Sequence, residues 1–241
     1  MEQPSIPNFL QLPTNQLLDH FGAGRHKPGS GSAAALLGLV SCKMMQTVIT
    51  VTRRNPGYAD NMAQLDYIES MLVDRDEPFF REAVQKDSEQ FDRYFKAIAA
   101  KRAATDEADR NRYTDLARQE LMPATEIPLD IARDAAETTE RGLSVYDLGV
   151  RHARGDSGVA VSAALSSCSG ALFIVYLNLR TFREGRWAQA TRSEADRIAA
   201  RYQALQIEQF RRVSRIQAEG VDNQQIDLQL NLELPDSDEP S

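Results

Sequence analysis

Two glycine-rich loops are the segments of this sequence best suited to bind a ligand. The first, PGSGS, spans residues 28–32, and the second, GDSG, spans residues 155–158; each leads into a long apolar stretch. The start of a helix exposes unpaired N–H groups and a partial positive charge, and glycine lets a ligand approach this backbone closely. Two such helix ends lying near one another would form an anion-binding site.

Ordinary helix capping by Ser30, Ser32 or Asp156 is the alternative interpretation of these loops. A nucleotide site is not indicated, because no G-x-G-x-x-G follows a predicted strand and no G-K-[ST] is present. The loops therefore predict either an anion site or two capped helix ends.

Helical periodicity dominates the elements that would position these loops. The sequence breaks at Pro123 and Pro128, and a further helix is expected from there to about Gly142. The other helical segments are expected at residues 14–21, 33–52, 60–75, 79–102, 105–122, 143–153, 159–179 and 188–219.

The segments 33–52 and 159–179 are rich in alanine, glycine and serine. Each is long enough to cross a membrane, but the first contains Lys43 and Gln46 and the second contains several serines. We therefore expect two central helices, buried on all sides, whose small residues permit close approach. The predicted fold is an all-α helical bundle, with the amphipathic helices packed around this pair.

The C-terminal segment differs from the rest of the chain in charge and in period. No lysine or arginine follows Arg215, while six acidic residues lie between Asp222 and Glu239. Residues 226–234 alternate apolar and polar residues, which predicts a short β-arm. A lone strand must pair, and we favour pairing within a dimer over addition to another protein's sheet, an extended arm along the bundle or a disordered acidic tail. The predicted organisation is an N-terminal arm (1–13), a helical domain (14–219) and an acidic tail (220–241).

Composition limits the classes of function. The chain has 241 residues with a net charge of −7, and without the acidic tail it is nearly neutral, which argues against general nucleic-acid binding. Cys42 and Cys168 lie in apolar runs and are expected to be buried thiols. With three histidines and no Cys/His spacing typical of zinc, no metal site is expected, and the cytoplasm is the simplest location.

The order of these features resembles the family of formiminotetrahydrofolate cyclodeaminases and methenyltetrahydrofolate cyclohydrolases. KPGSGSAAALLG resembles the family's PTPGGGSAAA-type signature, and GDSGVAVSAALSSCSGALFIVYLNL resembles its SDAGVA-type segment with the helix that follows. Between them, KDSEQFDRYFKA resembles an acidic D-x-E-x-F segment, and EIPLDIARDA resembles a VPL-containing helix. The likeness runs in the family's order from about residue 15 to residue 185.

The resemblance implies an all-α homodimer with a folate site built around the two loops near the subunit interface. It implies either closure of a formimino group onto a second folate nitrogen with loss of ammonia, or hydrolysis of the methenyl bridge. Both reactions move protons at folate nitrogens, so both need a positioned acid or base. Neither needs a metal or redox cofactor. The expected small-molecule partner is thus a tetrahydrofolate derivative, with no nucleic acid or membrane; residues 222–241 could bind a protein.

Matching the motifs residue by residue identifies the candidate site. Asp87 and Asp156 are predicted to act in proton transfer or pterin recognition; without the resemblance, Asp87 would be interpreted as a solvated helical acid. Phe91 matches the same motif as Asp87. His26 and Lys27 are added because they directly precede the first loop, in the glycine-rich stretch of residues 22–32, where an ordinary polar loop is the alternative. The predicted substrate-binding residues are His26, Lys27, Pro28, Gly29, Ser30, Gly31, Ser32, Gly158 and Asn178.

Two departures from the family pattern affect these predictions. Ser30 replaces the central glycine of the first loop, and its Cβ could crowd a ligand near the backbone. An asparagine-bearing stretch expected before the second loop is replaced by one containing Arg151, His152 and Arg154. A stand-alone cyclohydrolase is slightly favoured over a cyclodeaminase. The alternative is a divergent, inactive member that binds another small anion or acts as a dimeric interaction protein through its tail.

Overall fold

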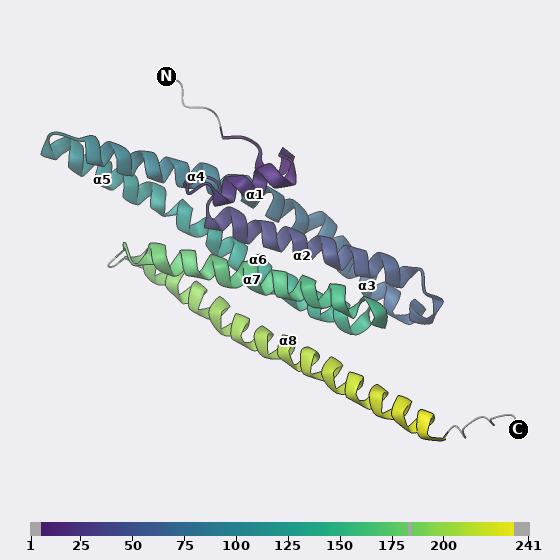
Figure 1. Cartoon of the computed structure of the whole chain (residues 1–241). Helices are drawn as coiled ribbons and strands as arrows, with labels where there is room; N and C mark the ends of the chain where they lie inside the picture. The colour runs from purple at the N-terminus through teal and green to yellow at the C-terminus, as the bar shows by residue number, and fades with distance from the viewer. Residues whose placement is uncertain (1–5, 183–184, 234–241) are drawn as a thin grey trace, which may run out of the picture.

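The chain folds into an all-α bundle, as the sequence predicts (Figure 1). The computed structural model describes residues 6–182 and 185–233, with the backbone alone over 220–233. Within these residues there is no strand. The helices are α1 (Thr14–Gly22), α2 (Ser30–Arg53), α3 (Met62–Met71), α4 (Glu77–Ala103), α5 (Glu107–Leu121), α6 (Pro123–Leu148), α7 (Arg154–Leu179) and α8 (Arg186–Glu233). A π-helical turn, Leu72–Asp76, joins α3 to α4.

The two small-residue helices, α2 and α7, lie antiparallel at the centre of the bundle (Figure 1). Ser41 Oγ on α2 donates a hydrogen bond to the Ala160 carbonyl on α7 over 2.7 Å, while Gly170 lies against Ala34. Small side chains allow this close packing. Both cysteines are fully buried beside this contact, as predicted, and burial raises the pKa of each thiol to about 12.

Neither central helix is buried on all sides, so that prediction is wrong in this detail. The large apolar side chains of Leu37 and Val40 on α2 are exposed, and Phe173 on α7 is 79% exposed. The small residues face the helix contact and leave larger apolar residues outside. Ser30–Arg53 and Arg151–Leu179 are long and apolar enough to cross a membrane by length and composition, but half of each apolar window is buried in the bundle.

Two glycines spaced seven residues apart bring α2 and α4 close together. A Cβ on Gly38 would meet the Phe80 ring at 2.4–2.6 Å, and a Cβ on Gly31 would meet the Asp87 carboxylate at 2.0–2.8 Å. Phe80 and Asp87 are also seven residues apart, so one residue of α4 fits over each glycine along the same seam. This packing places Asp87 against the first turn of α2.

Helix α6 is continuous where the sequence predicts interruptions. It begins at Pro123, contains Pro128 and runs through Gly142 to Leu148. Proline has no N–H, so Pro128 leaves the Ala124 carbonyl without its usual helical donor. Asn178 Nδ2 on α7 donates to that carbonyl over 3.1 Å. Tertiary packing therefore supplies the hydrogen bond that the local sequence lacks.

The predicted β-arm is wrong over residues 226–233, which continue helix α8; Leu234 lies outside the described residues. A strand there would need a partner strand, and none exists in the described part of the chain. A continuing helix satisfies its own backbone, and leucine, glutamine and glutamate are good helix formers. Contacts with α6 and α7 continue along α8 as far as Glu219, and beyond this residue the helix extends away from the other helices (Figure 1).

Candidate functional site

Asp87 on α4 is the central residue of the first loop site. Its side chain is buried, with the residue 7% exposed. The carboxylate accepts hydrogen bonds from the Ser32 backbone N–H at 2.8 Å and from Ser32 Oγ at 3.1 Å. Asp87, on α4, therefore accepts the hydrogen bond of a backbone N–H in the first turn of α2.

The glycine at position 31 is explained by this contact. Any side chain there would overlap the Asp87 carboxylate, whereas a Cβ on Gly29 would meet the same carboxylate at an ordinary 3.6 Å. Ser30, at the position where the family has glycine, is exposed and does not lie against Asp87. The first loop thus needs one glycine, Gly31, for the close contact between α2 and α4 within the chain.

Burial governs the protonation of Asp87. It raises the pKa of this carboxyl above its ordinary value, and the hydrogen bonds from Ser32 offset only part of the rise. No arginine, lysine or histidine among the described residues contributes to the shift. Asp87 is consequently a buried carboxyl held by neutral donors, and it stays protonated to a higher pH than an exposed aspartate.

Next to this carboxyl, His26 and Lys27 bind a second acidic residue, Asp92. His26 Nε2 lies 3.0 Å and Lys27 Nζ 2.8 Å from Asp92 Oδ1, and Lys96 Nζ lies 2.8 Å from Oδ2. Burial of Asp92 opposes ionisation, but these donors outweigh it and hold the pKa of Asp92 well below its usual range. The sequence analysis missed Asp92; its i,i+4 spacing from Lys96 was the available signal.

A cavity of about 540 Å³ opens beside the first loop. His26 stacks on Phe95 there, with ring centroids 4.1 Å apart and planes 14° from parallel. The buried Phe9 shows that the predicted N-terminal arm packs on the bundle at this point. Asp87 is not among the residues lining the cavity, which are Ile6, Pro7, Phe9, His20, Gly24, Arg25, His26, Lys27 and Phe95.

The second loop lies at the other end of the bundle. Because α2 and α7 are antiparallel, their first turns are separated by about 20 Å along the pair. Asp156 is exposed, and a Cβ on Gly158 would meet nothing within 4 Å. Within one chain, the two helix starts do not form a common anion site.

Side-chain capping of these helix starts is also absent in the described structure. The N-cap residues are Gly29 and Ala153, and neither forms a side-chain cap. At α2, Asp87 supplies the missing acceptor from α4. Of the predicted residues, the structure thus groups the loop from His26 to Ser32 with Asp87, and leaves Asp156 and Gly158 apart. Asn178 is engaged with the Ala124 carbonyl.

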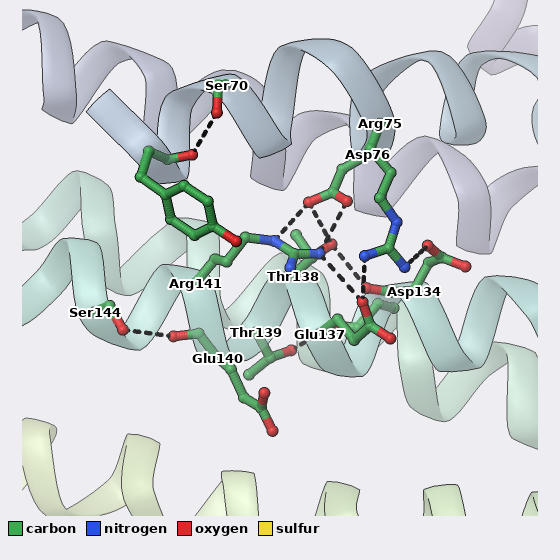
Figure 2. Close-up of polar contacts among 12 residues, drawn as sticks. Ser70, Arg75, Asp76, Asp134, Glu137, Thr138, Thr139, Glu140, Arg141 and Ser144 are labelled. Atoms are coloured by element: carbon green, nitrogen blue, oxygen red, sulfur yellow. Dashed lines mark hydrogen bonds and ion pairs between the residues drawn. The ribbon is translucent and has the colours of Figure 1, made fainter. Parts of the chain in front are cut away.

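A second buried polar cluster, shown in Figure 2, joins the π-helical turn to α6. Arg141 binds Asp76 through two hydrogen bonds of 2.7 and 2.9 Å, and Arg75 contacts Asp134 at 3.2 Å and Glu137 at 2.7 Å. Burial raises the pKa of Asp134 to about 6, which Arg75 only partly opposes. Among the described residues, no group of three or more His, Cys, Asp or Glu could hold a metal ion.

Comparisons with known proteins identify relatives over most of the chain. The family model described as formiminotransferase-cyclodeaminase matches residues 13–197. A methenyltetrahydrofolate cyclohydrolase from Methylorubrum extorquens is 26% identical over 191 residues, covering 78% of this chain and 89% of that protein. The crystal structure of formiminotetrahydrofolate cyclodeaminase from Thermotoga maritima is 17% identical, with a TM-score of 0.73, covering 86% of this chain and 98% of that one.

Proposed function

The chain belongs to the formiminotransferase-cyclodeaminase family, and we propose that it is a folate-dependent one-carbon enzyme. The reaction is hydrolysis of the methenyl bridge of a tetrahydrofolate, or cyclisation of a formimino group with release of ammonia. The similarity to a named cyclohydrolase over 78% of the chain supports the first reaction. The proposed enzyme acts in the cytoplasm on a tetrahydrofolate derivative without a further cofactor.

The observation that carries this proposal is the environment of Asp87. A carboxyl that is buried beside a glycine loop, has a raised pKa and lacks a cationic partner is suited to general acid catalysis. In both reactions a nitrogen must accept a proton as its bond to carbon breaks. The nitrogen is a ring nitrogen in the hydrolysis and the departing amine in the cyclisation. We assign this proton donation to Asp87.

The cavity beside the first loop is proposed to hold part of the folate molecule; Asp87 lies outside this cavity, at the first turn of α2. Its volume of about 540 Å³ is in the range of small-molecule sites, roughly 300–1,000 Å³. The stacked His26 and Phe95 provide a flat apolar surface for an aromatic ring system. Arg25 and Lys27, also on the cavity wall, provide positive charge for the carboxylates of the substrate.

We further propose that the active unit is a homodimer in which each site uses both loops. The exposed apolar residues on α2 and α7 support packing of this face against a second copy. If two copies stack with these helices antiparallel, the first loop of one meets the second loop of the other. Asp87 of one subunit would then share a site with Asp156 of its partner.

The reaction is tested by assaying the full chain with methenyltetrahydrofolate and with formiminotetrahydrofolate, following the absorbance of the methenyl chromophore. The proposal expects the chromophore to disappear with the first substrate or to form from the second. If calorimetry detects folate binding but neither substrate turns over, the divergent, inactive alternative replaces it; the Arg151–Arg154 stretch in place of the family's asparagines favours that alternative.

The shared site is tested by mixing two inactive variants, Asp87→Asn and Asp156→Asn, under conditions that exchange subunits. In a hybrid dimer, one of the two composite sites contains both native aspartates. Because half of randomly mixed dimers are hybrids, about a quarter of wild-type activity should return. A mixture as inactive as its components would show that each site lies within one chain.

A further inference from the structure

Five arginines surround a cavity of about 550 Å³ where α6 ends, α7 begins and α8 passes by. The cavity wall also contains Tyr58, Gly149 and two acids, Asp147 and Glu208. A third acid, Glu219, contacts Arg154 at 2.8 Å. The arginine cluster consists of Arg151, Arg154, Arg211, Arg212 and Arg215.

The described acids do not neutralise this cluster. Five guanidinium groups face three carboxylates, so two positive charges are in excess. The Nε atoms of Arg154 and Arg212 are buried without a hydrogen-bond partner. The Arg151 side chain forms no ion pair with any described residue. An arginine surplus of this kind predicts an anionic partner.

The chain itself contains a matching anionic segment. Six acids and no base lie between Asp222 and Glu239. This segment follows the arginines on the same helix, since α8 continues to Glu233, about 27 Å beyond Arg215. The chain from Glu233 to Glu239 spans at most about 22 Å, so only its fully extended end could reach Arg215 of its own chain, whereas Asp222 and Asp227 lie on the helix beyond the cluster.

The charges of α8 are arranged so that two copies of the helix are complementary. By helical period, positions 211, 215, 218, 222, 229 and 233 share one face. Along this face, Arg211 and Arg215 come first and Asp222 and Glu233 come last, with Ala218 near the middle. Two antiparallel copies therefore set the basic half of one against the acidic half of the other.

We propose that the arginine cluster receives the start of the acidic segment of α8, at Asp222, from a second copy of this chain. The two α8 helices pack antiparallel about a twofold axis near Ala218, with Arg215 of each opposite Asp222 of the other. Such a contact is isologous, so each copy gives and receives one acidic segment. It is separate from the α2–α7 face and involves a part of α8 beyond the family match, which ends at residue 197.

The twofold axis is tested first by disulfide formation in the full chain. Ala218→Cys places one exposed thiol near the axis, and Ala200→Cys is the matched control on an exposed, more N-terminal position of α8. Both native cysteines are buried. Under mild oxidation, Ala218→Cys should form covalent dimers at least about tenfold faster than Ala200→Cys. Equal rates for the two variants would overturn the proposal.

Charge reversal tests the pairing itself. Arg215→Glu and Asp222→Arg should each halve the mass of the assembly measured by light scattering at low salt, and the double variant should restore it. Positions 215 and 222 are about 10 Å apart on one helix, so restoration cannot come from pairing within a chain. Arg192→Glu, an exposed reversal elsewhere on α8, is the control and should leave the mass unchanged.

Two results would overturn the proposal even if the chain proves to be an active enzyme. One is an assembly mass that neither reversal alters. The other is calorimetric binding of inorganic phosphate that Arg215→Glu abolishes while the mass stays constant, which would make the cluster a small-anion site. These measurements need no turnover. If the chain is inactive but Ala218→Cys crosslinks as expected and the double reversal restores the assembly mass, the contact holds although the proposed reaction fails.

Discussion

Asp76 and Asp87 are both buried carboxylates with different partners. Asp76 is the last residue of the π-helical turn, and Asp87 lies in α4, which follows this turn without a break. Asp76 is fully buried and is bound through two hydrogen bonds by Arg141, with Arg75 nearby (Figure 2). Asp87 receives only the neutral donors of Ser32. Asp76, which has a cationic partner, and Asp87, which has none, are therefore eleven positions apart in the sequence.

The difference indicates which carboxylate is available for chemistry. Removing one member of a buried ion pair leaves the other uncompensated, so the Asp76–Arg141 pair is expected to hold the π-helical turn against α6. A buried carboxyl with neutral partners lowers the stability of the folded state when it ionises. Such carboxyls are found at functional sites, where the proton takes part in the reaction. We therefore expect Asp76 to matter mainly for folding and Asp87 mainly for turnover.

The largest predicted effect is the loss of turnover in Asp87→Asn. Asparagine keeps an acceptor for Ser32 but cannot donate a proton as an acid does, so kcat should fall by roughly 10²–10⁴-fold. The melting temperature should change little. Glu89→Gln, an exposed neighbour on α4, is the control and should retain full activity. Full activity in Asp87→Asn would remove the proposed distinction between the two aspartates.

Asp76→Ala is expected to affect stability more than turnover, because it leaves Arg141 buried without its partner. The free energy of unfolding, measured by urea denaturation, should fall by about 3–5 kcal/mol. Replacing both residues, as in Asp76→Leu with Arg141→Met, should cost less than the single change because no charge is left unpaired. A double variant less stable than Asp76→Ala would argue against ion pairing as the cause.

Gly31→Ala and Gly158→Ala test whether the first loop is sterically constrained and the second is not. The new Cβ at position 31 must displace the Asp87 carboxylate, which should cost about 1–3 kcal/mol of stability and lower kcat as well. At position 158 the Cβ meets nothing within 4 Å, so stability should be unchanged or slightly higher. Equal effects at the two glycines would contradict this geometry.

The sequence predicted the helices well, because their apolar period and their proline and glycine boundaries are local features. Through the order of the family's motifs, it also predicted that Asp87 and the first loop share a site; the structure brings the two into contact, and their role in a reaction stays a prediction. It could not show that Gly31 accommodates Asp87 or that Asp92 binds His26 and Lys27, since these contacts depend on how α2 and α4 pack. The strand prediction failed over 226–233 because alternation alone does not provide a pairing partner.

The free energy of unfolding should depend on pH through Asp134, the acid next to the Asp76–Arg141 pair. Its pKa is about 6 in the folded chain, above the ordinary value near 3.9, so the folded state binds this proton more tightly than the unfolded state. Its contribution to stability is therefore full below about pH 4 and is lost as the pH rises to about 6. Asp134→Asn should flatten this decline in urea titrations at pH 4.5 to 7.5. An unchanged slope would assign the decline to other groups.

The smallest predicted effect concerns Asn178, which forms a partly buried hydrogen bond between uncharged groups. Its side chain donates to the Ala124 carbonyl that Pro128 leaves without a helical donor, so Asn178→Ala should cost about 1 kcal/mol of stability. In a Pro128→Ala background the restored N–H of residue 128 can bond that carbonyl, and the same change should then cost almost nothing. A double-mutant cycle on the free energy of unfolding measures this coupling directly. If Asn178 instead binds substrate, KM will rise by a similar factor in both backgrounds and the two stability costs will be equal, because the carbonyl of Ala124 then has no part in the effect.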